Sequence, residues 1–185
     1  MAVDKENRTA TWFGESFDQL HLLIQQLHAD GGKLEGDITL NYGAGIAGVI
    51  GRRLGKKMNL PAAGLHHLSV EIFHDHEGLH WNRCFNRRNK VCSLFEPVGV
   101  IDNGHWIETT GLLTMKLTVE LRDGGWHWRC LTVSLAGIPV PRWLVPEAIA
   151  YKRIENELYQ FHVEFRLPIA GQLVCYRGLL SATTL

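Results

Sequence analysis

The sequence predicts an α+β fold with a large twisted antiparallel β-sheet and two helices. From about residue 67 onward, apolar residues alternate with polar ones, and this alternation is typical of strands that bury one face. Short turns separate the alternating segments, which favours antiparallel pairing. We expect about seven to nine strands. They would form a meander that curls into a half-barrel or barrel, with the N-terminal helix packed on its concave face.

The first helix is expected to begin at Ser16 and to end at Gly31. Ser16 and Gln19 have the spacing of a capping box, and a glycine is a common residue just after a helix. The polar residues 1–12 are expected to form a flexible tail. Apolar residues at helical spacing form one stripe, most simply laid on the sheet: Phe17, Leu20, Leu23, Ile24 and Leu27.

The stretch NYGAGIAGVIGRRLG contains Gly43, Gly45 and Gly48 in the spacing G-x-G-x-x-G, which also occurs in dinucleotide-binding loops. A Rossmann unit needs an uninterrupted helix after this loop and then a parallel strand. Here more glycines interrupt the helix, and the next strand turns straight back. We therefore expect no cofactor. Instead we predict a second helix from Ile46 to Met58 whose small residues let it pack closely on the sheet.

Basic residues crowd the last turns of this second helix. Cations suit a helix C-terminus, so one interpretation is a solvated helix end. The alternative is a basic patch that binds a lipid headgroup or a phosphate. On that alternative Arg52 and Arg53 are candidate ligand-binding residues. The four residues are Arg52, Arg53, Lys56 and Lys57.

The strand predictions are clearest in the second half of the chain. Residues 113–121 alternate between apolar and polar side chains, and RDGGWHW then predicts a hairpin turn into a returning strand with Trp126 and Trp128 on one face. Residues 159–167 alternate in the same way, with His162 and Glu164 on the wet face. The Pro-rich stretch GIPVPRWLVPEA is expected to be a loop.

Composition narrows the class of protein. A chain of 185 residues that is 45% hydrophobic suits a single domain over residues 1–185. Lys plus Arg and Asp plus Glu both number 19, which gives no reason to expect a nucleic-acid partner. The four cysteines contain no C-x-x-C pair and are expected to be structural thiols in strands. No apolar run is long enough to span a membrane, so we expect a cytoplasmic protein.

Two groups of side chains are candidates for a site. Trp81, Arg83 and Phe85 occupy alternate strand positions, so that an arginine lies between two aromatic residues on one face. This arginine would either clamp a ligand carboxylate or phosphate or pair with Glu96 or Glu108. The second group is His74, His76 and His80 with Glu77. Its geometry would allow a zinc site, but the segment also has the pattern of an exposed hairpin tip, and we expect no metal.

The order of the motifs resembles a bacterial domain-of-unknown-function family, DUF4166. The resemblance runs from about residue 12 to 180 and rests on YGAGIAGVIGRRLGKKMNLPAAG, HWNRCFNRRNKVCS, GIPVPRWLVP and YQFHVEFRLPIAGQLVCYRGLL. The chain departs from the family pattern at NRRNK, where the family has a glycine-bearing turn. The family pattern matches Trp81, Arg83, Phe85, Ser93, Pro139, Pro141, Gly171, Tyr176 and Gly178.

The resemblance implies no activity, because the family's activity is unassigned. The family occurs alone or fused behind a saccharopine-dehydrogenase-like domain, which implies an oxidoreductase as a partner. We expect a non-catalytic binding module for a hydrophobic or amphipathic, lipid-like small molecule in an apolar cavity. The alternatives are a domain that docks on a protein partner and an enzyme with an acid/base site around Arg83, in which Glu96, Glu108 or His162 supplies the acid or base. The candidate ligand-binding residues are Trp81, Arg83, Phe85, Glu96, Glu108, Tyr176, Arg52 and Arg53.

Overall fold

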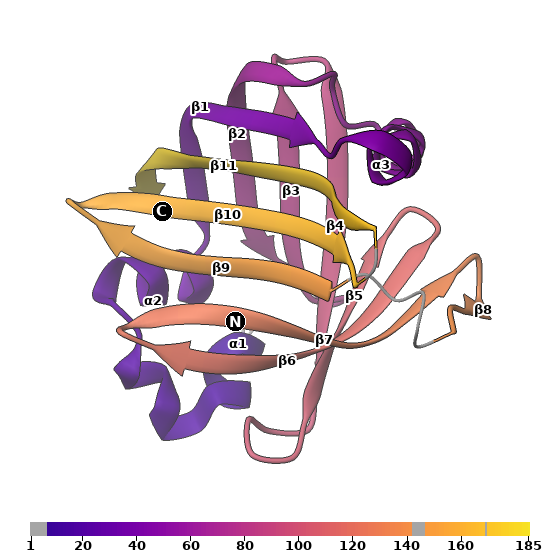
Figure 1. Ribbon diagram of the computed structural model, residues 1–185. Coiled ribbons are helices and arrows are strands. Elements are labelled where there is room, and N and C mark those ends of the chain that lie inside the picture. The colour runs from indigo at the N-terminus through magenta and orange to yellow at the C-terminus, as the bar shows by residue number, and fades with distance from the viewer. Residues whose placement is uncertain (1–6, 142–146, 169) are drawn as a thin grey trace.

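The computed structural model describes residues 7–141, 147–168 and 170–185. These residues form an antiparallel β-barrel with helices at its margins (Figure 1). The strands are β1 (Gly32–Tyr42), β2 (Gly64–His74), β3 (Leu79–Phe85), β4 (Asn89–Val98), β5 (His105–Thr110), β6 (Leu113–Arg122), β7 (Gly125–Leu135), β8 (Ile138–Pro139), β9 (Glu147–Glu155), β10 (Leu158–Leu167) and β11 (Gly171–Thr184).

Ten of these strands close into a ring. Hydrogen bonds link them in the order β6-β5-β4-β3-β2-β1-β11-β10-β9-β7, and β7 pairs back with β6. The remaining strand, β8, pairs with the end of β7. The described strands thus exceed the seven to nine that the sequence predicts, and the sheet is closed rather than half-open. Closure joins strands far apart in the chain, such as β1 and β11, and local alternation carries no information about that pairing.

The strands that alternation predicts most clearly are confirmed. In β6, Met115, Leu117 and Val119 are buried at alternate positions. The turn between β6 and β7 places Asp123 and Gly124 at positive φ, as a two-residue hairpin turn requires. Part of the Pro-rich stretch is strand rather than loop, because β8 lies within it and β9 begins at its end. The middle of that stretch, residues 142–146, lies outside the described residues.

The N-terminal segment differs from the single helix expected. Residues Arg8–Phe13 form α1 where a flexible tail is predicted, and Trp12 is buried; residues 1–6 lie outside the described part of the chain. The expected helix divides into a 3-10 helix η1 (Gly14–Gln19) and α2 (Leu22–Ala29), with Leu20 extended between them. His21 caps α2, since its Nδ1 accepts a hydrogen bond from the backbone N–H of Leu23 at 3.2 Å.

The stripe predicted for this segment still faces the core despite the break. Leu20, Ile24 and Leu27 are buried, and Phe17 and Leu23 pack against the same cluster. In Figure 1, α1 and α2 lie together at one end of the barrel, while the third helix lies apart from them. Among the described residues, no helix is long and apolar enough to cross a membrane.

The glycine-rich stretch forms this third helix, α3 (Gly45–Lys57), as predicted. Its buried positions are Ala47, Gly48, Gly51 and Gly55. A Cβ atom on Gly51 would lie 1.9 Å from the carbonyl oxygen of Leu173 in β11. The glycines therefore allow the helix backbone to approach the barrel wall closely.

Candidate functional site

Polar side chains from β3, β4, β5 and β11 gather inside the barrel. Arg83 of β3 donates a hydrogen bond from Nη1 to the Tyr176 hydroxyl oxygen at 2.9 Å and another from Nη2 to Ser93 Oγ. Ser93 donates to Glu108 Oε1 at 2.9 Å, and Thr110 donates to the same oxygen at 3.1 Å. The Nη2 of Arg83 lies 3.9 Å from Oε1 of Glu108. Hydroxyl groups thus bridge a buried ion pair.

Strand register places these polar groups at inward positions. Trp81 of β3 pairs with Ser93 of β4, and Phe95 of β4 pairs with Glu108 of β5. Paired side chains of antiparallel strands lie on the same face of a sheet. Buried charges are tolerated when they are paired and hydrogen-bonded, which the hydroxyl bridge provides. The Nε of Arg83 is buried and has no hydrogen-bond partner among the described residues.

Lys152 of β9 supplies a second interior cation. Its Nζ lies 4.1 Å from the ring centroid of Trp81, 4.3 Å from that of Trp126 and 5.5 Å from that of Trp128. The faces of indole rings attract cations. Lys152 Nζ also lies 3.3 Å from Nε2 of His28, which α2 extends into the barrel. Side chains from two strands, β3 and β7, and from helix α2 therefore surround one amino group.

Burial affects the ionisation of both members of this contact. Loss of solvent lowers the pKa of Lys152 well below its ordinary value; the nearby Glu108 opposes the shift and Arg83 adds to it. Burial likewise lowers the pKa of His28, and Lys152 lowers it further. A negative charge brought close to Lys152 would favour its ammonium form and raise its pKa.

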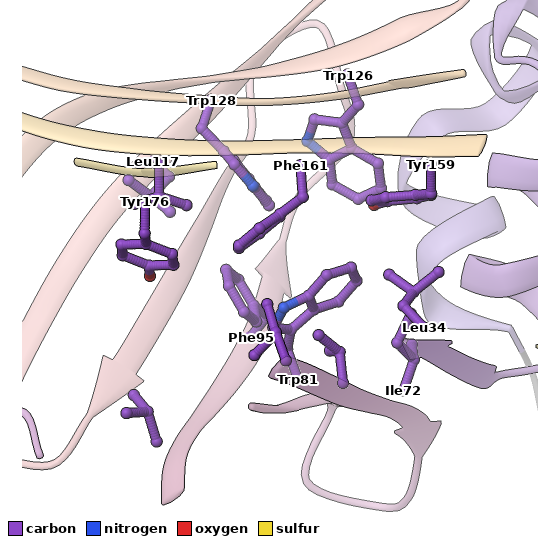
Figure 2. Packing of buried hydrophobic residues seen from close by; sticks show 14 of the residues in the cluster. Leu34, Ile72, Trp81, Phe95, Leu117, Trp126, Trp128, Tyr159, Phe161 and Tyr176 are labelled. Atoms are coloured by element: carbon purple, nitrogen blue, oxygen red, sulfur yellow. The ribbon is translucent and has the colours of Figure 1, made fainter. Parts of the chain in front are cut away.

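A cavity of about 50 Å³ lies beside these groups. Its polar wall is formed by Arg83, Glu108, Lys152 and Tyr176 together with Tyr151 and His162. Figure 2 shows aromatic side chains from opposite strands meeting in the adjoining interior. The cavity has room for a few water molecules or a small chemical group. Its apolar wall is formed mainly by Trp81, Phe95, Leu117, Trp128, Phe161 and Phe165.

The structure brings together part of the set of residues predicted from the sequence. Trp81, Arg83, Glu108 and Tyr176 line the cavity. Phe85 is buried beside Tyr176, with 5.9 Å between ring centroids, but does not line it.

Three other predicted residues lie elsewhere. Glu96 is exposed and points away from the interior, because it is one position out of step with the inward-facing Phe95. Glu96 therefore cannot take part in an acid/base site with Arg83. Arg52 and Arg53 are exposed on α3, outside the barrel.

The sequence reasoning missed Lys152 and His28. Lys152 shares a strand face with Ala150 and Ile154, which is a weak sign of an inward position because Ile149 and Tyr151 occupy the opposite face. His28 follows Ile24 by four residues and extends the apolar stripe of α2. Both signals were present in the sequence, but a single polar residue in an apolar stripe does not reveal its partners. Those partners come from β3 and β7, far away in the chain.

Of the histidines that the sequence offers as a possible zinc site, in a segment expected to be an exposed hairpin tip, His74 and His80 have separate partners in the structure. His74 Nε2 lies 2.8 Å from the backbone oxygen of His28. His76 is exposed on the turn between β2 and β3, whereas His80 Nε2 lies 2.9 Å from Asp75 Oδ2. This hydrogen bond is the main reason that the pKa of Asp75 falls to about 2.

Two other sets of side chains could offer ligand atoms to a metal ion. Among the described residues, Asp75, Glu77 and His80 form one set, and His162, Glu164 and Cys175 form the other, with the ligand atoms of each set within 4.8 Å of one another. Contrary to the expected wet face, His162 and Glu164 are buried. Arg166 Nε already donates to Glu164 Oε1 at 3.0 Å, so this carboxylate has a cationic partner.

The comparisons with known proteins identify the chain through its family. No curated protein and no solved structure matches it. The model of a domain of unknown function, DUF4166, matches residues 20–180, which is most of the chain. The protein therefore belongs to the DUF4166 family.

Proposed function

We propose that the barrel is a binding module for a small amphipathic molecule that carries an anionic group. The observation behind this proposal is the composition of the cavity wall. Two basic side chains, Arg83 and Lys152, face one carboxylate, Glu108, beside an aromatic surface. A ligand anion would supply the second negative charge, and the rings would cover its apolar part.

The position of the hydrogen-bond donors supports an anion rather than a cation. Arg83 Nε has no partner among the described residues, and Lys152 has no carboxylate in hydrogen-bond contact in that part of the chain. An anion near Lys152 would raise its lowered pKa, so that binding would take up a proton.

The size of the cavity favours a small molecule over a long acyl chain. Its volume is about 50 Å³, whereas sites for drug-sized ligands are commonly about 300–1,000 Å³. Met58, the residue after α3, also lines the cavity and is partly exposed. Its unbranched side chain has several rotatable bonds, so a rotamer change at Met58 would enlarge the space.

The expected setting of this activity is the cytoplasm of a bacterial cell, beside a nucleotide-dependent oxidoreductase. The family resemblance supports that setting, and the free thiols agree with a reducing compartment. Co-purification of the full chain with such an enzyme from a bacterial host is the corresponding test.

A titration tests the binding proposal directly. We expect hexanoate to change the fluorescence of the interior tryptophans in a saturable way, and the uncharged hexanamide and the cationic hexylamine not to do so. Arg83→Lys keeps the charge but loses the planar fork, so it should weaken binding. Arg83→Met should abolish binding, while Arg88→Met, at an exposed turn position, should leave it unchanged.

Two results would overturn the assignment. One is equal binding of hexylamine and hexanoate. The other is unfolding of both Arg83 variants, which would make this arginine a structural member of the core. Native mass spectrometry of the purified protein would show independently whether an anionic molecule is retained.

A further inference from the structure

In helix α3 the small residues are buried and several large apolar residues are exposed, which is the reverse of the usual arrangement. A helix on the surface of a protein normally buries its large apolar residues and exposes its polar ones. Here alanine and glycine occupy the buried face, and Gly51 and Gly55 sit against the backbone of Leu173 and the ring of Tyr42. Three of the large apolar side chains are exposed instead, whereas Leu54 packs against the core.

The outward face begins with three branched apolar residues. The exposed fractions of Ile46, Val49 and Ile50 are 77%, 43% and 39%. Their spacing of three and four residues places them on one side of the helix. Contiguous exposed apolar patches, unlike single scattered residues, are typical of surfaces that contact a protein or a membrane.

The same face continues into basic residues. Arg53 and Lys57 follow Ile46 and Ile50 at helical spacing, and Lys56 and Arg52 flank them. The helix has no acidic residue, and none of the four cations forms an ion pair in the part of the chain that the structure describes. This apolar and basic face of α3 is therefore both hydrophobic and positively charged.

We propose that α3 docks the protein on the surface of an anionic phospholipid bilayer. The three apolar side chains would enter the interface between headgroups and acyl chains, and the cations would contact lipid phosphates. Helix α3 contains no aromatic residue and no methionine, which are residues enriched in protein interfaces, whereas its lysines and its alanine belong to types that are depleted there. Branched aliphatic residues combined with lysine and arginine suit a fluid, negatively charged surface better.

Docking would also orient the barrel. Met58 directly follows α3 and lines the interior cavity, so a docked helix holds that wall of the cavity next to the bilayer. Arg52 and Lys56 line a surface groove of about 470 Å³ on the flank of the same helix, where headgroups would have access. Membrane docking goes beyond ligand binding and does not depend on it.

Flotation of the full chain with vesicles tests this proposal. We expect binding to vesicles of phosphatidylcholine mixed with phosphatidylglycerol, and little binding to phosphatidylcholine alone. The double variant Arg53→Gln with Lys57→Gln should weaken binding about 30-fold, on the basis of the usual contribution of two cations at such a surface. The double variant Ile46→Asn with Ile50→Asn should also weaken vesicle binding, although it leaves the charge of α3 unchanged.

Matched controls lie away from α3. Arg87→Gln with Arg88→Gln removes two exposed charges from the turn between β3 and β4, and Leu112→Asn removes an apolar side chain that is as exposed as Ile46. Both controls should bind vesicles like the parent protein. Because all changed side chains are exposed, the thermal melts of the variants and the parent protein should coincide. If the double variant Ile46→Asn with Ile50→Asn loses stability, the double variant Arg53→Gln with Lys57→Gln still tests the proposal.

The proposal fails if the chain does not float with anionic vesicles, or if the variants and controls float equally. Competition by millimolar inorganic phosphate that removes all binding would indicate a free-phosphate site instead. Binding to a protein partner that survives in the absence of anionic vesicle binding would likewise overturn it. The hexanoate titration without vesicles reports on the cavity separately, so the two proposals can fail independently.

Discussion

Lys152 illustrates how a basic side chain is accommodated in the core without a carboxylate in direct contact. Three indole rings and one imidazole surround its amino group. Removing an ammonium ion from water carries a large free-energy cost, and cation–π contacts offset part of it. The residue therefore combines a packing role, through its aliphatic stem, with an electrostatic one.

A pair of substitutions separates these two roles. Lys152→Met keeps most of the volume and removes the buried charge, so the free energy of unfolding should stay the same or rise. Lys152→Ala leaves a void and should lower it by about 2–5 kcal/mol. Chemical denaturation of the three proteins measures both effects. Equal losses in the two variants would show that the charge itself stabilises the fold.

His28 predicts a dependence of stability on pH. Its pKa in the folded protein lies well below the ordinary value of 6.5, so the unfolded chain binds a proton at a pH where folded His28 does not. The contribution of His28 is therefore fully present above pH 6.5 and declines as the pH falls. Denaturation from neutral to mildly acidic pH should show a shallower decline for His28→Gln than for the parent protein.

The matched control for this experiment is His76→Gln. His76 is exposed on the turn between β2 and β3, and its replacement should leave the pH profile unchanged. If the parent protein and His28→Gln declined in parallel, the buried imidazole would not be the group that links folding to protons.

The limits of sequence reasoning are clear at the scale of single residues. Alternation in β3 placed Trp81 and Arg83 correctly on one face. The sequence offered Glu96 and Glu108 as ion-pair partners of Arg83, and the structure has the pair with Glu108. The choice between Glu96 and Glu108 needed the register of β4, because Glu96 lies one residue from an inward position. To predict the contacts of Lys152, one would have to know which strand lies opposite β3 across the barrel.

At the scale of elements, α3 shows what a glycine pattern can and cannot specify. The sequence predicts the helix and its close packing, and both are confirmed. The division of residues 14–29 into η1 and α2 was not predicted. Apolar residues at helical spacing keep facing the core across a short extended break, so periodicity does not detect it.

Gly51→Val tests the close approach of α3 to β11. The new side chain would collide with the backbone of Leu173, so we expect a loss of about 1–3 kcal/mol in stability through overpacking. Val49→Ile, on the exposed side of the same helix, should have no measurable effect on a thermal melt. An unchanged melting temperature for Gly51→Val would show that the helix can shift without cost.

The same helix geometry argues against a dinucleotide site. In α3 Gly45 is exposed, but Gly48, Gly51 and Gly55 are buried and are not open to solvent, where motif glycines would have to lie to receive a pyrophosphate. Titration with NAD should therefore show no saturable binding. Micromolar affinity would restore the cofactor interpretation.

For the whole molecule, the N-terminal helices are part of the barrel's core rather than an appendage. Trp12 of α1 packs edge-to-face on Trp106, with 5.4 Å between ring centroids, and its Nε1 donates to the backbone oxygen of Val98 at 3.2 Å. The polar composition of residues 1–12 concealed this anchor, because α1 buries only three residues, Thr9, Trp12 and Phe13.

Trp12→Ala should therefore destabilise the whole barrel by about 3–5 kcal/mol. The matched control is Leu22→Ala, which truncates an exposed apolar residue at the start of α2 and should change stability little. Far-ultraviolet circular dichroism during thermal unfolding measures both. A loss confined to helical signal, with the strands still folded, would contradict this role.

Barrel closure was the feature least accessible to sequence reasoning, because it depends on pairing between β1 and β11 and among β6, β7 and β9.

Closure also affects how the protein behaves at high concentration. An open sheet presents a row of unpaired N–H and C=O groups on which a second chain can add a strand. Among the described strands, β8 alone has a single neighbour. It is two residues long, and one of them, Pro139, has no N–H to offer. The ring thus leaves little backbone that could template edge-to-edge aggregation, and this protection comes from topology rather than from charged gatekeeper residues.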